Sequence, residues 1–258
     1  MHQNKSVSIV FPAYNEEQGI AAAVQDFLSV PVVDKVYVID NNSKDRTAQL
    51  ARDAGAIVIT ETNQGYGWAL RRGLKEADTD IVVLCEPDGT FIARDVNKLL
   101  SYAEDFSMVM GTRTTRELIW REANMGFFLR VGNFVVAKLL SVLFNGPSLS
   151  DCGCTFRLVH RELAAKLNPH LTVGASHFLP EMVIFSLMME APVIEIPVNY
   201  RGRVGESKIT GSWKGVFKTG FAMLFLILRY RISGYAGLKG RLKNEFRSTI
   251  APRRNGGE

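Results

Sequence analysis

Two carboxylates at the end of an apolar run are the residues with the clearest chemical potential in this sequence. Residues 82–85 (VVLC) are apolar, and Glu86 and Asp88 follow on either side of Pro87. An ionised carboxylate near a buried strand needs a cation or several donors facing it. One suitable chemistry is a divalent cation held between carboxylates and phosphate oxygens. The alternative is an ordinary turn, because Pro-Asp-Gly is also a turn signal.

The elements around these carboxylates follow an alternating pattern. Apolar runs rich in Val and Ile predict strands, helical patterns lie between them, Ser43 is a candidate N-cap, and Gly55 is a candidate stop. The strands are expected over 7–14, 35–40, 56–60, 80–89 and 107–113, and the helices over 16–29, 43–55, 66–77 and 94–104. This alternation predicts an α/β fold with a doubly wound, mostly parallel sheet and helices on both faces.

The exits of the expected strands are all polar or contain glycine: PAYNEE, DNNSKD, ETNQGYG, EPDGT and GTR. Such sheets bind ligands beyond the carboxyl ends of their strands, so Glu86 and Asp88 are expected on a ligand-binding rim. If the ligand is a nucleotide-sugar, Tyr14 can stack on its base, and Asp40 can accept a hydrogen bond from its ribose or base. Gly65 and Gly67 start a helix where the backbone can approach phosphate or sugar closely, although an ordinary helix start is the alternative.

Several function classes are disfavoured by the residues themselves. The chain has no G-x-G-x-x-G, no G-x-x-x-x-G-K-[ST] and no G-x-S-x-G, which argues against dinucleotide oxidoreductases, P-loop enzymes and serine hydrolases. The three cysteines, Cys85, Cys152 and Cys154, are too few for a disulfide framework and lack zinc spacing. They are expected to be buried thiols in a reducing compartment.

The second half of the chain is more apolar, and its end is basic. Residues 124–146 and 212–232 predict helices that are apolar nearly all round, but basic residues interrupt or bound each one. They are either buried core helices or helices lying in a membrane interface. Residues 229–258 carry eight Lys/Arg and two Glu, which suits an anionic membrane. Nucleic acid is not expected as a partner, because few aromatic residues accompany these charges.

In order and spacing, the motifs VSIVFPAYNEEQGI, VYVIDNNSKDRT, NQGYGWALRRG, EPDGT and GTR resemble family 2 glycosyltransferases of GT-A fold. DCGCTFRL (151–158) and YRGRVGESKI (200–209) resemble the branch that transfers sugars to polyprenyl phosphates. The resemblance implies a GT-A domain over 1–211, including an interface helix at 124–144. An amphipathic helix at 213–232 and a basic tail would complete residues 212–258.

The resemblance also implies roles for individual residues. For the nucleotide-sugar, GDP- or UDP-linked, it implies Pro12, Tyr14, Glu16, Asp40, Gly65, Gly67, Glu86 and Asp88. For the phosphate of a dolichyl or undecaprenyl acceptor, it implies Arg113, Arg157, Arg203, Ser207 and Lys208. Asp88, Asp151, Arg203 and Lys208 would be catalytic, with Asp151 the candidate base if the acceptor is a hydroxyl.

The expected cofactor is Mg²⁺ or Mn²⁺, bound by Glu86 and Asp88, where the family has two aspartates. Thr90 occupies a position at which the branch can carry a glutamine that touches the metal. His177 is the one histidine in this region, and a packing role is favoured over catalysis.

The reaction implied is an inverting transfer to a polyprenyl phosphate, by a peripheral protein at the cytoplasmic face of a membrane with no transmembrane span. A polyprenyl phosphate is already an anionic nucleophile, so it needs cations more than it needs a base. Two alternatives remain: transfer to a saccharide hydroxyl in surface-polysaccharide assembly, and a non-catalytic module that binds a nucleotide-sugar or a membrane.

Overall fold

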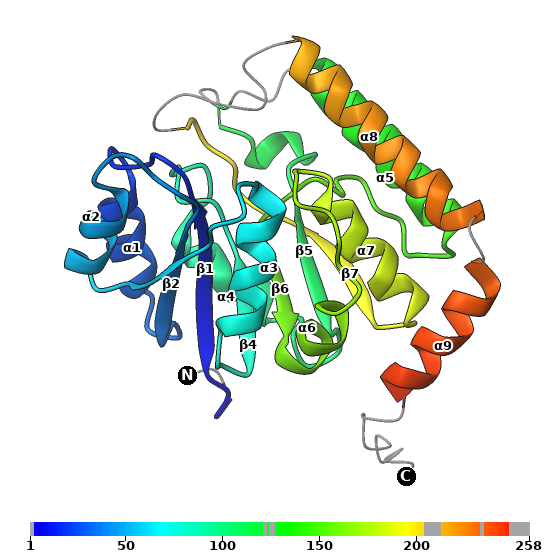
Figure 1. Cartoon of the computed structure of the whole chain (residues 1–258), viewed down its shortest axis with the longest axis horizontal. Helices are drawn as coiled ribbons and strands as arrows, with labels where there is room; N and C mark the ends of the chain where they lie inside the picture. Colours follow the sequence, from blue (N-terminus) through cyan, green and yellow to red (C-terminus); the bar gives the residue numbers. More distant parts are fainter. Residues whose placement is uncertain (1–2, 121–122, 124–126, 204–212, 233–234, 248–258) are drawn as a thin grey trace.

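A seven-stranded sheet organises the part of the chain that this computed structural model describes, namely residues 3–120, 123, 127–203, 213–232 and 235–247. The strands lie in the order β3-β2-β1-β4-β6-β5-β7 (Figure 1). They are β1 (Val7–Ala13), β2 (Lys35–Asp40), β3 (Ile57–Thr60), β4 (Ile81–Leu84), β5 (Met108–Thr112), β6 (Arg157–His160) and β7 (Val193–Pro197). Only β6 is antiparallel to its neighbours. The predicted doubly wound, mostly parallel sheet is confirmed.

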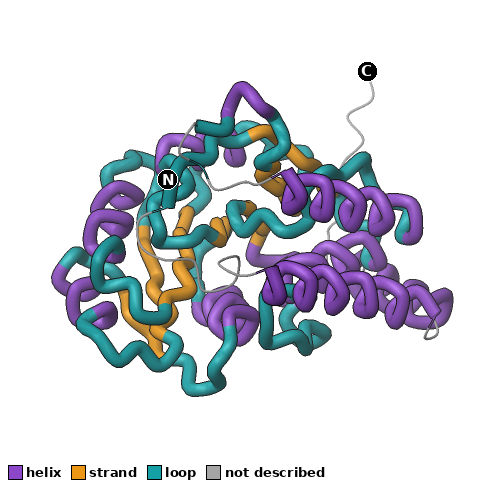
Figure 2. Tube along the Cα trace, turned by 90° about the horizontal axis from the view of Figure 1, so that it is seen from above, coloured by secondary structure: helices purple, strands orange, loops and turns teal. Residues whose placement is uncertain are grey.

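Helices cover both faces of this sheet, and Figure 2 shows the strands between them. They are α1 (Ile20–Leu28), α2 (Thr47–Asp53), α3 (Tyr66–Glu76), α4 (Val96–Leu100), α5 (Phe127–Leu143), α6 (Arg161–Leu167), α7 (Phe178–Met188), α8 (Trp213–Ile232) and α9 (Tyr235–Arg247), with 3₁₀ turns at Ala93–Asp95 and Arg116–Leu118. Residues of α1, α2 and α4 belong to the core on one face, and residues of α3 and α5 to α9 belong to the core on the other.

The alternation of side chains along each strand explains the two cores. In β1, Val10 joins one core, whereas Ile9 and Phe11 join the other, because successive strand residues point to opposite faces. Helix α3 packs very closely on the first face: a Cβ added at Gly73 would lie 2.2 Å from Val10 Cγ1. Glycine at this position therefore lets α3 approach the sheet.

The predicted start of the second helix was wrong. Ser43 does not cap it, because Ser43 Oγ instead accepts a hydrogen bond from Asn15 N at 3.0 Å and ties the exit of β1 to that of β2. The N-cap position is Arg46, which makes no capping bond with its side chain, and Asp45 just before it accepts a hydrogen bond from Thr47 N at 3.0 Å through Oδ1. The predicted stop at Gly55 is confirmed by its left-handed backbone, with φ of 99°.

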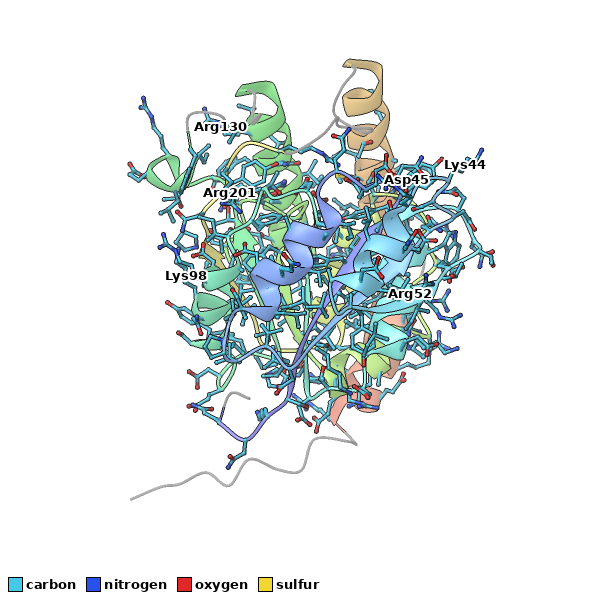
Figure 3. The ribbon with its side chains drawn as sticks, turned by 90° about the vertical axis from the view of Figure 1, so that its left-hand side faces the viewer. Lys44, Asp45, Arg52, Lys98, Arg130 and Arg201 are labelled. Carbon is cyan, nitrogen blue, oxygen red and sulfur yellow. The ribbon has the colours of Figure 1, made fainter. Side chains whose placement is uncertain are left out.

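Helices α5 and α8 pack against each other and against the core, yet their outer faces carry exposed apolar side chains. Each of the following is at least 44% exposed: Val131, Phe134, Val135, Val142, Phe221, Phe225, Leu228 and Ile232. We call these eight residues the outer apolar face. Figure 3 shows the upper ends of both helices projecting above the sheet, with Arg130 near the upper end of α5.

Within the described residues, no single helix has the length and apolar character to cross a membrane. Thr219–Ile232 and Gly237–Arg247 meet that test only as a pair, and they are bent by 89° relative to each other.

Candidate active site

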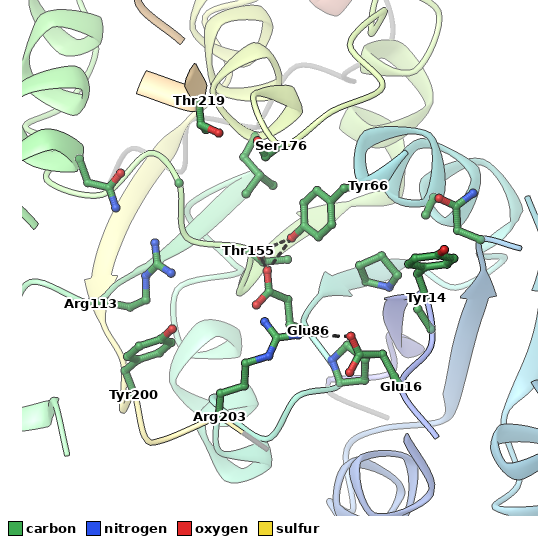
Figure 4. Close-up of a pocket in the computed structure, with 18 of the residues that line it drawn as sticks. Tyr14, Glu16, Tyr66, Glu86, Arg113, Thr155, Ser176, Tyr200, Arg203 and Thr219 are labelled. Carbon is green, nitrogen blue, oxygen red and sulfur yellow. Dashed lines mark hydrogen bonds and ion pairs between the residues drawn. The ribbon is translucent and has the colours of Figure 1, made fainter. Parts of the chain in front are cut away.

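A pocket of about 370 Å³ lies over the carboxyl ends of β1 and β4. Six of the residues predicted for the site line it: Pro12, Tyr14, Glu16, Glu86, Arg113 and Arg203. The exits of β1, β2 and β4 supply one wall, and Arg113 at the end of β5 supplies the other together with loops and helices further along the chain (Figure 4). The structure therefore brings these six predicted residues together around one cavity.

Glu86 lies in this pocket and is held by two hydroxyl groups. Its Oε1 accepts hydrogen bonds from Tyr66 Oη and Thr155 Oγ1, both at 3.0 Å. Burial, followed by repulsion from the Asp88 carboxylate, raises the pKa of Glu86 to about 7. The Glu86 carboxyl is therefore easily protonated near neutral pH, and a cation beside it would favour the ionised form.

Asp88 lies beneath the pocket and is 1% exposed. Its Oδ1 accepts from Thr90 N at 3.0 Å and from Thr90 Oγ1 at 2.6 Å. Its Oδ2 pairs with Arg203 Nη1 at 3.2 Å, and Nη2 of the same guanidinium lies 3.2 Å from Glu16 Oε1. Arg203 therefore bridges the exits of β1 and β4, and the Thr90 hydroxyl orients Asp88.

The donor set at Glu86 and Asp88 suits a hard divalent cation that shares its coordination with a ligand. Within the described residues, no group of three or more His, Cys, Asp and Glu side chains could hold a metal ion without other ligands. Two carboxylates are nevertheless enough for Mg²⁺ when phosphate oxygens and water supply the remaining positions. The Asp88 carboxylate repels that of Glu86, and a cation bound between them would offset this repulsion.

Arg113 enters the pocket from the end of β5, and Asp151 fixes its direction. Arg113 Nε lies 2.7 Å from Asp151 Oδ2, and Nη2 lies 2.9 Å from Oδ1. The guanidinium also lies over the Tyr200 ring, 5.3 Å from its centroid. Asp151 is fully buried with both oxygens on Arg113. Its burial and its ion pair favour a role in positioning Arg113 over the predicted role as a base.

Arg157 is not available to an acceptor phosphate, which corrects a second expectation. The side chain is fully buried. Its guanidinium donates to the carbonyl oxygens of Cys152, Cys154 and Leu179. Arg157 therefore braces the loop that carries Asp151.

Gly65 and Gly67 do not line the pocket, and their small size serves packing instead. A Cβ at Gly65 would lie 2.3 Å from Gly174 O, and one at Gly67 would lie 2.3 Å from Val173 O. The amide of Gly67 donates to Gly174 O at 2.8 Å. The two glycines therefore let the start of α3 dock against the 173–175 loop, whose neighbour Ser176 does line the pocket.

Asp40 lies at the end of β2 behind the pocket wall, where Asn41 provides the lining side chain. Asp40 is 7% exposed, and its Oδ1 has no hydrogen-bond partner among the described residues. His177 does not line the pocket either, and burial lowers its pKa. Ser207 and Lys208 lie outside the described residues.

Sequence reasoning missed several residues of the second wall: Asn133 of α5, Thr155, Ser176, Tyr200 and Thr219 of α8. Tyr66, which holds Glu86, was missed as well. Of these residues, only Tyr66, Thr155 and Tyr200 lie within the motifs that carry the family resemblance. The others follow from tertiary packing, and no local pattern marks them.

Comparison with known proteins identifies the family. The sequence model of glycosyl transferase family 2 matches residues 8–167. A dolichyl-phosphate hexose transferase of Haloferax volcanii is 31% identical over 204 residues, which are 79% of this chain and 86% of that protein. The dolichyl-phosphate beta-glucosyltransferase of Mus musculus is 26% identical over 88% of this chain and 76% of its own.

The fold is shared with solved structures of low sequence identity. Glucosyl-3-phosphoglycerate synthase from Mycobacterium tuberculosis, in complex with Mn²⁺, UDP-glucose and phosphoglyceric acid, superimposes with a TM-score of 0.68 at 20% identity. The match covers 87% of this chain and 80% of that one. It confirms the GT-A fold. Because the family model matches more than half of the chain, the protein belongs to glycosyl transferase family 2.

Proposed function

We propose that this glycosyltransferase moves a sugar from a nucleotide-diphosphate sugar to a polyprenyl phosphate at a membrane surface, with inversion at the anomeric carbon. The observation that carries the proposal is the double role of α5 and α8. Asn133, Thr219 and Met223 on these helices line the pocket, while the same two helices present the outer apolar face. A site built this way can receive a phosphate whose chain remains in lipid.

The donor occupies the wall formed by the exits of β1, β2 and β4. Tyr14 and Pro12 line the pocket beside Asn41, and the Asp40 Oδ1 just behind them is an acceptor that a base N–H or a ribose hydroxyl could satisfy. Glu86 and Asp88 would hold Mg²⁺ or Mn²⁺, which supplies charge neutralisation for the leaving diphosphate. Arg203 adds a fixed positive charge at the same place.

The acceptor phosphate occupies the opposite wall, where Arg113 presents its guanidinium between Asp151 and Tyr200. Arginine suits this role because its planar fork matches phosphate oxygens. The phosphate is an anion at neutral pH, so attack on the anomeric carbon needs orientation and charge balance rather than a strong base. Ser207 and Lys208, from the YRGRVGESKI motif, complete the proposed acceptor set.

Membrane association is peripheral in this proposal, at the cytoplasmic face. The outer apolar face would enter the interface, and Arg130, Lys138, Arg229 and Arg231 on the same helices would meet anionic headgroups. Residues 1–211 would be the catalytic part and 212–258 the membrane-facing part, although Met223, Ile227 and Leu242 of the latter share a core with the former.

The test is a transfer assay with labelled GDP-mannose, UDP-glucose and a UDP-amino sugar, each offered with polyprenyl phosphate or with a saccharide acceptor. Reactions contain Mn²⁺, Mg²⁺ or EDTA. The proposal expects label in the organic phase as a lipid-linked monosaccharide, with one donor preferred and no product in EDTA. Label found only on the saccharide would favour the alternative function in polysaccharide assembly.

A further inference from the structure

We infer that Glu195, on β7, is a positioning residue that fixes the direction of Arg113 toward the acceptor through the Ser150–Asp151 segment. The inference rests on the proposed function, because it takes Arg113 to be the ligand of the acceptor phosphate. Glu195 does not line the pocket. It acts through contacts that start at its carboxylate and end at the guanidinium.

The Glu195 carboxylate holds the Ser150–Asp151 segment with three short hydrogen bonds. Its Oε2 accepts from Ser150 N and Ser150 Oγ, both at 2.7 Å, and its Oε1 accepts from Asp151 N at 2.7 Å. Hydrogen bonds from two successive amides to one carboxylate fix the local backbone, because both oxygens are used and neither amide can turn away.

The support on which Glu195 stands is rigid and lies next to Arg113 in the sheet. Glu195 is paired with Met110 in the parallel ladder between β7 and β5, and β5 ends at Thr112, the residue before Arg113. The Ser150 hydroxyl also lies 2.9 Å from the Thr112 hydroxyl, which links the segment to the end of β5. Arg113 and Asp151 are therefore both anchored to β5 and β7, Arg113 through the chain and Asp151 through hydrogen bonds.

The last contact sets the direction of the guanidinium. Asp151 engages Nε and Nη2 of Arg113 and also accepts from its backbone N at 3.2 Å, so Nη1 lies outside this ion pair. The side chain of Arg113 is 13% exposed, and that of Asp151 is fully buried. A bidentate pair with a buried carboxylate leaves the arginine little choice of direction. Any shift of Asp151 would therefore move the guanidinium of Arg113 in the pocket.

The test replaces Glu195 with glutamine, which keeps the size but turns one acceptor into an amide donor that opposes a backbone N–H. We expect Glu195→Gln to raise the KM for polyprenyl phosphate about tenfold, while the KM for the donor changes less than about twofold. Glu162→Gln, an exposed carboxylate of α6, is the matched control and should leave both values unchanged. Melting temperatures of all variants exclude a general loss of fold.

A double-mutant cycle with Arg113→Ala distinguishes positioning from a merely structural role. If Glu195 acts through Arg113, adding Glu195→Gln to Arg113→Ala produces no further rise in the acceptor KM. Additive effects, equal rises in the KM of donor and acceptor, or an unchanged acceptor KM would overturn the inference. If Glu195→Gln does not fold, Ser150→Ala removes one of the three bonds and is expected to give a smaller rise with the same lack of additivity.

Failure of the proposed function has a different signature. In that case the wild-type protein transfers sugar to an acceptor other than polyprenyl phosphate. The cycle is then measured with that acceptor, and non-additivity of Glu195 and Arg113 still supports the positioning role, whereas additivity still overturns it.

Discussion

The two walls of the pocket are built in different ways. The wall proposed to bind the donor uses short runs of neighbouring residues, with Pro12, Tyr14 and Glu16 at the end of β1 and Glu86 and Pro87 after β4. The wall proposed to bind the acceptor gathers single residues from five separate segments: Arg113, Asn133, Thr155, Tyr200 and Thr219. The first wall is set by local motifs on a parallel sheet, and the second by tertiary packing of loops and helices. This difference implies that donor binding and acceptor binding can be damaged separately.

The largest expected effect is that of Asp88, the carboxylate that Arg203 links to Glu16. Asp88→Ala removes a proposed metal ligand and the partner of Arg203 Nη1, so we expect kcat to fall about a thousandfold. Steady-state kinetics with saturating Mn²⁺ measure it. Asp53→Ala, an exposed aspartate at the end of α2, is the control. Near-normal turnover by Asp88→Ala would contradict the proposed role of Asp88 in holding the metal ion and Arg203.

Arg113→Ala sharpens the separation of the walls. It deletes the cation of the acceptor wall and leaves Asp151 buried without its partner, so we expect the acceptor KM to rise about a hundredfold. Donor binding, measured by calorimetry with the nucleotide-sugar and Mn²⁺, should change little. Equal losses for donor and acceptor would mean that the two walls are not independent.

Gly67→Ala tests the packing of the start of α3 against the 173–175 loop. The new Cβ would lie 2.3 Å from Val173 O, a backbone atom, so we expect a loss of about 2 kcal/mol in the free energy of unfolding. Urea titration measures this loss. Gly220→Ala in α8, where a Cβ would have no neighbour within 4 Å, should be neutral or slightly stabilising. Equal stability of the two variants would contradict the packing role of Gly67.

The smallest expected effect lies outside both walls. Replacing Phe221 and Phe225 with serine removes two side chains that are 70% and 69% exposed on α8, so sedimentation with anionic vesicles should weaken about tenfold. Turnover of a short, soluble polyprenyl phosphate should be unchanged. Tyr102→Ser, a 40% exposed aromatic just after α4, is the control. Unchanged vesicle binding by the double variant would contradict the proposal that α8 contacts the membrane.

The same contrast explains how much could be predicted from the sequence. The five strands of the first half, the parallel sheet and the position of Glu86 and Asp88 follow from apolar runs that end in polar motifs. Strands β6 and β7 are short, and β6 enters the sheet antiparallel between β4 and β5. The pairing of β6 with strands far from it in the sequence depends on tertiary packing, and no local sequence pattern indicates it.

For three kinds of residue, the role predicted from residue type differs from the one that the contacts favour. Arg157 and Asp151 have the charges expected of a phosphate-binding site, but each is fully buried on partners that use its polar atoms. Gly65 and Gly67 have the pattern of a phosphate loop, but a carbonyl of the 173–175 loop occupies the space where a side chain would be. Burial and contact partners decide these roles, and a single sequence contains neither.

The most direct test of the central claim is a calorimetric titration of UDP and of GDP into the wild-type protein and into Asp88→Asn, with Mn²⁺ and with EDTA. The account predicts that one nucleoside diphosphate binds the wild type tightly with Mn²⁺ and at least about tenfold more weakly in EDTA. It also predicts that Asp88→Asn loses the difference between the two conditions. Equal affinity with and without the cation in the wild type would contradict the claim that Glu86 and Asp88 hold the donor through a metal ion.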